Sequence, residues 1–169
     1  MNKIKIGIVG TGFIGPAHIE ALRRLPNVEV AALCEFTQEL AEQKAAQLGI
    51  PRAYIFEDLL KQEDIQCIHI CTPNFLHYSQ SKAALLAGKH VVCEKPMALS
   101  TNECEQMMEA AKQYDRKLFV VKQNRFNPPV EAVKRVLEEG RLGDIMSVQL
   151  NCFWNRNPDY YKNSWKGTR

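Results

Sequence analysis

The stretch Lys-Ile-Lys-Ile-Gly-Ile-Val-Gly-Thr-Gly-Phe-Ile-Gly, residues 3–15, decides the fold of this chain. Its apolar run up to Val9 predicts a buried strand, and the residues after Gly15 predict a helix. Three glycines lie between them in the spacing G-x-G-x-x-G. A strand, a glycine-rich turn and a helix in this order form the setting in which that motif binds the pyrophosphate of a dinucleotide.

Each glycine of the turn has its own expected role. Gly10 permits the tight turn, Gly12 lets the backbone approach a pyrophosphate, and Gly15 lets the helix pack closely against the strand. Exposed N–H groups and the helix dipole then favour the negative phosphates. The alternative is a cluster of ordinary turn glycines, and the absence of G-K-[ST] excludes a nucleoside triphosphatase loop. The expected phosphate loop comprises Gly10, Thr11, Gly12, Phe13, Ile14 and Gly15.

Short apolar runs alternate with helix-like segments as far as residue 122. Uniformly apolar strands separated by helices indicate a parallel sheet covered on both faces, the doubly wound α/β class. Thr37 and Gly49 are expected to cap the second helix, and Ser100 with Glu103 forms a capping-box pattern. The expected strands are 3–9, 28–34, 53–56, 66–71, 89–93 and 117–121, and the expected helices are 14–25, 37–48, 75–87 and 100–114.

The pattern changes after residue 122. Pro128 and Pro129 lead into a helix that ends near Gly140, and the partial alternation of 144–153 predicts a strand. The last 17 residues carry five aromatic side chains with no further element to bury them. We predict a dinucleotide-binding domain over 1–122 and, over 123–169, the truncated start of a second α+β domain of which the chain lacks the remainder.

Composition narrows the possible partners. The chain has 169 residues, and its net charge of +3 is too small and too dispersed to indicate binding to nucleic acid or to a membrane. The six cysteines show no C-x-x-C spacing, no His/Cys/Asp cluster has metal-ligand spacing, and Met1 leads directly into a strand. We expect a reduced cytoplasmic protein without a metal ion.

Glu35 ends the second predicted strand, twenty residues beyond Gly15. This is where an acidic side chain accepts hydrogen bonds from the adenosine ribose hydroxyls of a dinucleotide. Its negative charge would repel a 2′-phosphate, and no arginine follows in residues 36–38, so we predict NAD(H) rather than NADP(H). The alternative is a surface glutamate at the start of a helix.

Polar residues also follow two later strands. Cys71, Thr72, Pro73, Asn74 and His77 come after the fourth strand, and Glu94-Lys95-Pro96 follows the fifth. Ligands of doubly wound sheets bind beyond the carboxyl ends of the strands, so both segments are expected to face the nicotinamide half of the cofactor. A lysine partly desolvated there can serve in proton transfer.

These segments resemble the glucose-fructose oxidoreductase / inositol dehydrogenase (Gfo/Idh/MocA) family. The resemblance rests on Cys-Thr-Pro-Asn-x-x-His at 71–77, Ala-Gly-Lys-His-Val at 87–91 and Glu-Lys-Pro at 94–96, and the glycine loop with His18 and Asn-Arg-Phe at 124–126 fits it too. The tail over 153–167 is also similar to members that oxidise nucleotide-linked amino sugars, the UDP-N-acetylglucosaminuronate 3-dehydrogenases.

The resemblance implies roles for particular side chains. Lys95 would contact the reacting hydroxyl or carbonyl, Glu94 would hold the nicotinamide ribose, and Arg125 would either pair with the cofactor or substrate or form a structural salt bridge. The substrate would be a sugar, polyol or nucleotide sugar, and the intact protein a homo-oligomer. The cofactor-lining residues would be Cys71, Thr72, Pro73, Asn74, His77, Glu94, Lys95, Asn124 and Arg125.

The chain departs from the family in one respect. Family members are about twice as long, and their second domain supplies a catalytic Asp and His. All four histidines of this chain lie before residue 122, so we expect the chain to bind cofactor but to turn over substrate poorly. Of these histidines, His69 is expected in the core, and His18 either near the pyrophosphate or packed in the interior.

Two other functions remain open at this point. A dinucleotide-binding module can act without catalysis, as a redox sensor or partner subunit, and the same module occurs in enzymes with other chemistry, such as imine or tetrapyrrole reduction. The Glu-Lys-Pro ending favours hydride transfer to or from a secondary alcohol, because binding alone does not require a lysine at the hydride end.

Overall fold

The computed structural model describes residues 3–162. The chain divides into two compact units, Met1–Val121 and Lys122–Arg169. The division falls one residue before the boundary expected from the sequence.

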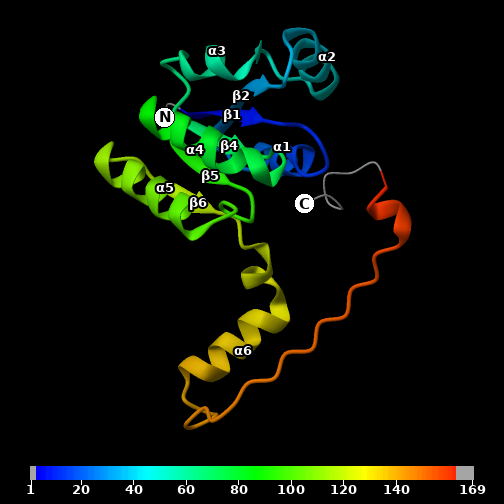
Figure 1. Cartoon of the computed structure of the whole chain (residues 1–169), viewed down its shortest axis with the longest axis vertical. Coiled ribbons are helices and arrows are strands. Elements are labelled where there is room, and N and C mark those ends of the chain that lie inside the picture. Colours follow the sequence, from blue (N-terminus) through cyan, green and yellow to red (C-terminus); the bar gives the residue numbers. More distant parts are fainter. Residues whose placement is uncertain (1–2, 163–169) are drawn as a thin grey trace. The chain divides into compact units, whose positions relative to one another are not determined.

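The first unit is built on a six-stranded sheet in the order β3-β2-β1-β4-β5-β6 (Figure 1). All neighbouring strands are parallel. The winding reverses between β1 and β4, which are neighbours in space although two strands lie between them in the chain. The strands are β1 Ile4–Val9, β2 Val28–Cys34, β3 Ala53–Tyr54, β4 Cys67–Ile70, β5 His90–Cys93 and β6 Leu118–Val120. The predicted doubly wound parallel fold is confirmed.

Helices cover both faces of this sheet. On one face, α1 (Gly15–Arg23) and α2 (Gln38–Leu48) pack through Ile19 and Ala41 onto β1 and β2. On the other, α3 (Phe56–Leu60), α4 (His77–Leu86) and α5 (Thr101–Gln113) pack onto the sheet through Leu59, Leu85 and Met107. Burial of apolar side chains on both faces explains why the strands are almost uniformly apolar.

The expected helix caps are confirmed. The Thr37 hydroxyl accepts a hydrogen bond from the Leu40 N–H at 3.2 Å. Gly49 ends the same helix in the left-handed conformation, with φ of +62°. Ser100 and Glu103 form the capping box that the sequence predicted.

The region after β2 differs from the prediction. The third strand is shorter than expected, and Phe56, assigned to that strand from its apolar neighbours, instead begins α3. The acidic residues Glu57 and Asp58 stand in the first turn of this helix, where they favour the positive end of its dipole. The segment after β4 also divides, into a 3₁₀ turn η1 (Asn74–Leu76) and α4.

The second unit contains η2 (Gln123–Phe126), α6 (Pro128–Glu138) and η3 (Pro158–Tyr160). The helix after Pro128 is confirmed, but the strand predicted over 144–153 is wrong, since these residues form no regular secondary structure. A strand needs a hydrogen-bonding neighbour, and no described segment of 122–162 supplies one. Among the aromatic residues of the tail, Trp165 lies outside the described residues. No helix in the described part of the chain is long and apolar enough to cross a membrane.

Candidate functional site

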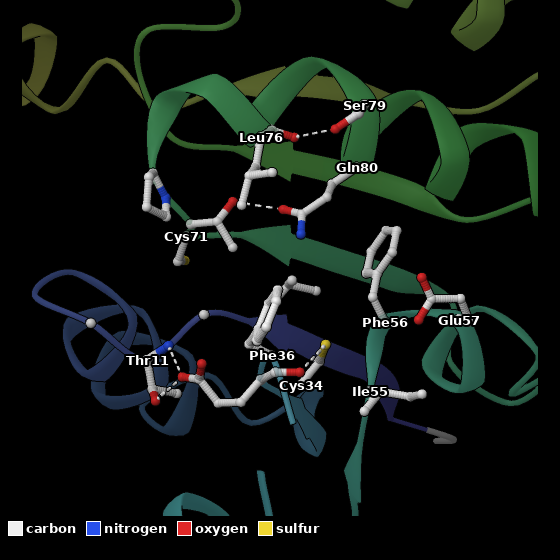
Figure 2. A pocket seen from close by; sticks show the side chains of 16 residues that line it. Thr11, Cys34, Phe36, Ile55, Phe56, Glu57, Cys71, Leu76, Ser79 and Gln80 are labelled. Carbon is white, nitrogen blue, oxygen red and sulfur yellow. Dashed lines mark hydrogen bonds between the residues drawn. The ribbon is translucent and has the colours of Figure 1, made fainter. Parts of the chain in front are cut away.

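A cavity of about 720 Å³ opens at the carboxyl ends of β1, β2 and β4 (Figure 2). This is the edge at which the winding of the sheet reverses, and ligands of doubly wound folds bind at such a point. The walls bring together seven residues expected from the sequence, namely Gly10, Thr11, Gly12, Glu35, Cys71, Thr72 and Pro73.

The glycine turn forms one wall of the cavity. Gly10 has a φ of +86°, which L side chains rarely adopt, and a Cβ there would lie 3.1 Å from the Thr72 backbone nitrogen. A Cβ on Gly12 would meet no atom within 4 Å, so the backbone at Gly12 faces open space. Of the other residues expected in this loop, Phe13 is exposed and Ile14 packs against the core beneath α1.

Glu35 lies at the end of β2, against the glycine turn. Its Oε1 accepts hydrogen bonds from the backbone N–H of Thr11, at 2.6 Å, and from the Thr11 hydroxyl. No described residue donates a hydrogen bond to Oε2. A half-buried carboxylate beside the phosphate loop therefore has one oxygen held by the loop and one available to a ligand.

The opposite wall consists of residues that the sequence motifs did not indicate. Leu76, Ser79 and Gln80 line it from η1 and α4, and Figure 2 shows Leu76 and Gln80 on the far side of the cavity from Thr11. The hydroxyl of Thr72 donates to Gln80 Oε1 at 2.6 Å. The i, i+3, i+4 spacing from Leu76 was a usable signal, because it places all three residues on one helix face.

Two aromatic residues near β2 and α3 were missed as well. Phe36 and Phe56 line the cavity together with Ile55 and Glu57, and Phe36 is 91% exposed. The position of Phe36 directly after Glu35 could have indicated its place at the cavity. Phe56 could not be found in this way, because it had been assigned to a strand.

The thiols at the cavity are poorly suited to act as nucleophiles. Burial raises the pKa of the Cys34 thiol to about 12, and the negative charges of Glu35 and Glu57 add to the effect. Burial and the Glu94 carboxylate likewise raise the pKa of Cys71. Because the thiolate is the reactive form, Cys71 serves as a small apolar wall residue.

A second group of polar residues follows β5. Glu94 is only 7% exposed and accepts hydrogen bonds from the Lys95 N–H at 3.1 Å and from His18 Nε2 at 2.9 Å. Burial pushes the pKa of Glu94 upward, but these hydrogen bonds outweigh it and hold the pKa below its usual value. The carboxylate is therefore ionised at neutral pH.

Lys95 is exposed, and its peptide bond to Pro96 is cis. Neither Glu94 nor Lys95 belongs to the cavity wall. Both lie past the carboxyl end of β5, which is the same edge of the sheet because all its strands are parallel. The described residues do not desolvate Lys95, so the desolvation expected from the sequence would have to come from a bound ligand or from other protein.

His77 is placed between the loops after β4 and β5. It is 1% exposed, and its two ring nitrogens lie 2.8 Å from the Thr72 carbonyl oxygen and 2.6 Å from that of Pro96. The ring thus ties Thr72, in the cavity wall, to the segment that follows Lys95. Its direct contact with a cofactor stays a prediction.

The remaining expected site residues are not among those that line the cavity. Asn74 is in η1 and does not line the cavity. Asn124 and Arg125 lie in η2, within the second unit, so their roles toward the cofactor also stay predictions.

Comparison with known proteins identifies the family of this domain. Residues 4–122 match the Gfo/Idh/MocA model, which describes an oxidoreductase family with an NAD-binding Rossmann fold. The chain is 31% identical, over 94% of its length, to a levoglucosan dehydrogenase of Pseudarthrobacter phenanthrenivorans. It is 29% identical, over 95%, to an inositol 2-dehydrogenase/D-chiro-inositol 3-dehydrogenase of Lactiplantibacillus plantarum.

Among solved structures, the WlbA dehydrogenase of Bordetella pertussis in complex with NADH and UDP-GlcNAcA has a TM-score of 0.90 and 35% identity. That similarity covers 96% of this chain and 50% of the WlbA chain. The chain spans about half the length of the relatives that it matches. Its first unit carries the glycine turn, the acidic end of β2 and the Glu-Lys-Pro ending of β5, and the chain belongs to the Gfo/Idh/MocA oxidoreductase family.

Proposed function

We propose that the cavity binds NAD(H) and that the protein transfers a hydride between this cofactor and a secondary alcohol of a sugar, polyol or nucleotide sugar. The observation that carries the proposal is a shared edge of the sheet. The glycine turn, Glu35 and the Glu94–Lys95 pair all stand at the carboxyl ends of parallel strands.

The cavity fits the adenosine and pyrophosphate parts of the cofactor. The open face of Gly12 leaves room for a phosphate to reach the backbone at the start of α1, where the helix dipole favours negative charge. Glu35 Oε2, to which none of the described residues donates, can accept hydrogen bonds from two ribose hydroxyls. Apolar side chains of Phe36, Phe56 and Leu76 offer surfaces for an adenine ring.

The acidic residues that line the cavity support a preference for NAD(H) over NADP(H). Glu35 and Glu57 both line the cavity, and no lysine or arginine among the described residues does. A 2′-phosphate at Glu35 would therefore be close to one or two carboxylates with no cationic partner. Coulomb repulsion between neighbouring negative charges is large where water is partly excluded.

Glu94 and Lys95 would serve the reactive half of the site. Bound NAD supplies the hydride acceptor, or NADH the donor, at C4 of the nicotinamide. The ionised Glu94 would hold the nicotinamide ribose, and the Lys95 ammonium would exchange a proton with the substrate oxygen as it changes between hydroxyl and carbonyl.

The relatives support the substrate class. Those with stated substrates include dehydrogenases of levoglucosan and inositol, and a WlbA enzyme in complex with UDP-GlcNAcA. The similarity to this WlbA structure covers 96% of the chain, against 84% for the levoglucosan dehydrogenase complex.

Replacement of the lysine tests the proposal. In the full-length protein, assayed with NAD and a panel of sugars, polyols and nucleotide sugars, Lys95→Ala is expected to lower kcat by roughly 10²- to 10⁴-fold. The affinity for NADH should stay within about threefold, because the pyrophosphate and adenosine contacts remain. Lys112→Ala, on the exposed side of α5, is the charge-matched control and should leave both unchanged. Near-normal turnover of Lys95→Ala would overturn the assignment.

A further inference from the structure

A chain of hydrogen bonds links three titratable side chains, of which Glu94 and His69 are buried and His18 is partly buried. His18 Nε2 lies 2.9 Å from Glu94 Oε1, and His18 Nδ1 lies 3.0 Å from His69 Nδ1. The two imidazole rings are edge to face, with centroids 5.2 Å apart. His18 lies in α1, His69 lies in β4 and Glu94 directly follows β5. The hydrogen bonds therefore join three separate elements of the first unit.

Elementary hydrogen-bond chemistry fixes the direction of one bond. An ionised carboxylate only accepts, so His18 Nε2 carries a proton and donates it to Glu94. Between the two Nδ1 atoms lies one further proton, since one ring must donate and the other accept. His69 thereby determines which way the His18 ring faces and keeps its Nε2–H directed at Glu94.

The imidazole of His69 is neutral at neutral pH. Burial, and next to it the charge of His18, lowers the pKa of His69 from 6.5 to about 4. The ring is 8% exposed and stands in the middle of β4. A neutral imidazole has one donor and one acceptor nitrogen, which is what a link in a hydrogen-bonded chain requires.

The hydrogen-bonded chain of side chains ends at the backbone N–H of Lys95, the expected catalytic lysine. Glu94 Oε1 accepts a hydrogen bond from His18 Nε2, and Glu94 Oε2 accepts one from the Lys95 N–H. Within the described residues, His18 and Lys95 are the cationic or protonatable groups that act on Glu94. The neighbouring thiols, Cys71 and Cys93, are neutral because burial raises the pKa of both.

We propose that His18 and His69 are positioning residues that fix the Glu94 carboxylate and thereby the nicotinamide end of the dinucleotide site. The inference rests on the proposed function, because it assumes that Glu94 faces the nicotinamide ribose. On this proposal, His18 and His69 affect the binding of the nicotinamide half of the cofactor and not of the adenosine half, although neither histidine lines the cavity. A packing role would affect the whole fold and both halves of the cofactor alike.

The hydrogen-bonded chain itself is tested without cofactor. Nitrogen-15 NMR of the imidazole rings in the 169-residue chain should show a proton on His18 Nε2 and a hydrogen bond between the two Nδ1 atoms. The resonances of His69 should not titrate between pH 7 and pH 5. Two rings that titrate independently, or a His18 ring without a proton on Nε2, would overturn the inference.

The positioning effect is tested by comparing NADH with ADP, which lacks the nicotinamide and its ribose. His18→Leu is expected to weaken NADH binding about tenfold, because it removes a hydrogen bond to a charged group, and to leave ADP binding within about twofold. His18→Gln, which keeps a donor near the position of Nε2, should recover most of the loss. His69→Leu and His69→Asn form a second pair, with the Asn variant retaining a donor, and they serve if His18→Leu does not fold.

The outcomes separate this inference from the proposed function. Selective loss of NADH affinity with recovery by His18→Gln supports positioning. Equal loss for NADH and ADP, or no loss in either, overturns it while leaving NAD(H) binding intact. Failure of the unchanged chain to bind NADH would instead overturn the proposed function.

Discussion

Gly15 lies directly against the carbonyl oxygen of Gly10. A Cβ on Gly15 would stand 2.3 Å from that oxygen, a non-bonded distance that Cβ atoms in proteins essentially never show. The first turn of α1 is therefore seated on the end of β1 with no space for a side chain. This close approach of the two backbones requires glycine at position 15.

Gly15→Ala should consequently destabilise the fold. The obstacle is backbone, which cannot rotate away as a side chain would, so α1 must shift from β1. We expect a loss of about 3 kcal/mol in the free energy of unfolding, measured by urea denaturation followed by circular dichroism. A loss below about 0.5 kcal/mol would contradict the packing described here.

Gly12→Ala provides the matched comparison within the same turn. Its Cβ would meet no protein atom within 4 Å, so the free energy of unfolding should change little. The added methyl group would instead occupy the space through which a phosphate approaches the backbone. We expect NADH affinity to fall at least about tenfold, measured by calorimetric titration. Unchanged affinity in a folded Gly12→Ala variant would show that the pyrophosphate binds elsewhere.

Glu35→Ala is expected to relax cofactor selectivity. Removal of the carboxylate eliminates both the acceptor for the ribose hydroxyls and the repulsion of a 2′-phosphate. NADH should bind more weakly and NADPH more strongly, so that the ratio of the two dissociation constants changes by about tenfold or more. Glu39→Ala, an exposed glutamate in the first turn of α2, is the control. If the ratio is the same in Glu35→Ala and in the unchanged chain, Glu35 does not select the cofactor.

His69 should make the fold less stable in mild acid. Its pKa is about 4 in the folded protein and near 6.5 when unfolded, so only the unfolded chain takes up this proton between those values. The free energy of unfolding therefore falls by about 3 kcal/mol as the pH is lowered from about 6.5 to 4. Denaturant titrations at pH 7 and pH 4 should show a smaller difference for His69→Leu than for the unchanged chain. Equal differences would mean that the proton on His69 is not linked to folding.

The sheet and much of the cavity could be predicted from local sequence. Apolar runs of strand length marked all six strands, and the caps at Thr37, Gly49 and Ser100 followed from single side chains. The glycine turn and Glu35 were located by their spacing from β1. Such features depend on neighbours in the chain, which the sequence shows directly.

Features that depend on distant contacts could not be predicted in this way. The strand expected over 144–153 fails because apolar alternation does not supply a pairing partner. His77 lies between Thr72 and Pro96 because two loops close around it, and the hydrogen bonds from His18 to His69 and Glu94 span 51 and 76 residues. Only the packed fold brings these groups together.

Titration of the 169-residue chain with NADH and NADPH tests the central claim most directly. We predict saturable binding of NADH that ADP competes away, with NADPH binding at least about tenfold more weakly. Competition by ADP would show that the ADP part of the cofactor and free ADP bind at one site. A folded chain that showed no binding of NADH at millimolar concentration would contradict the account.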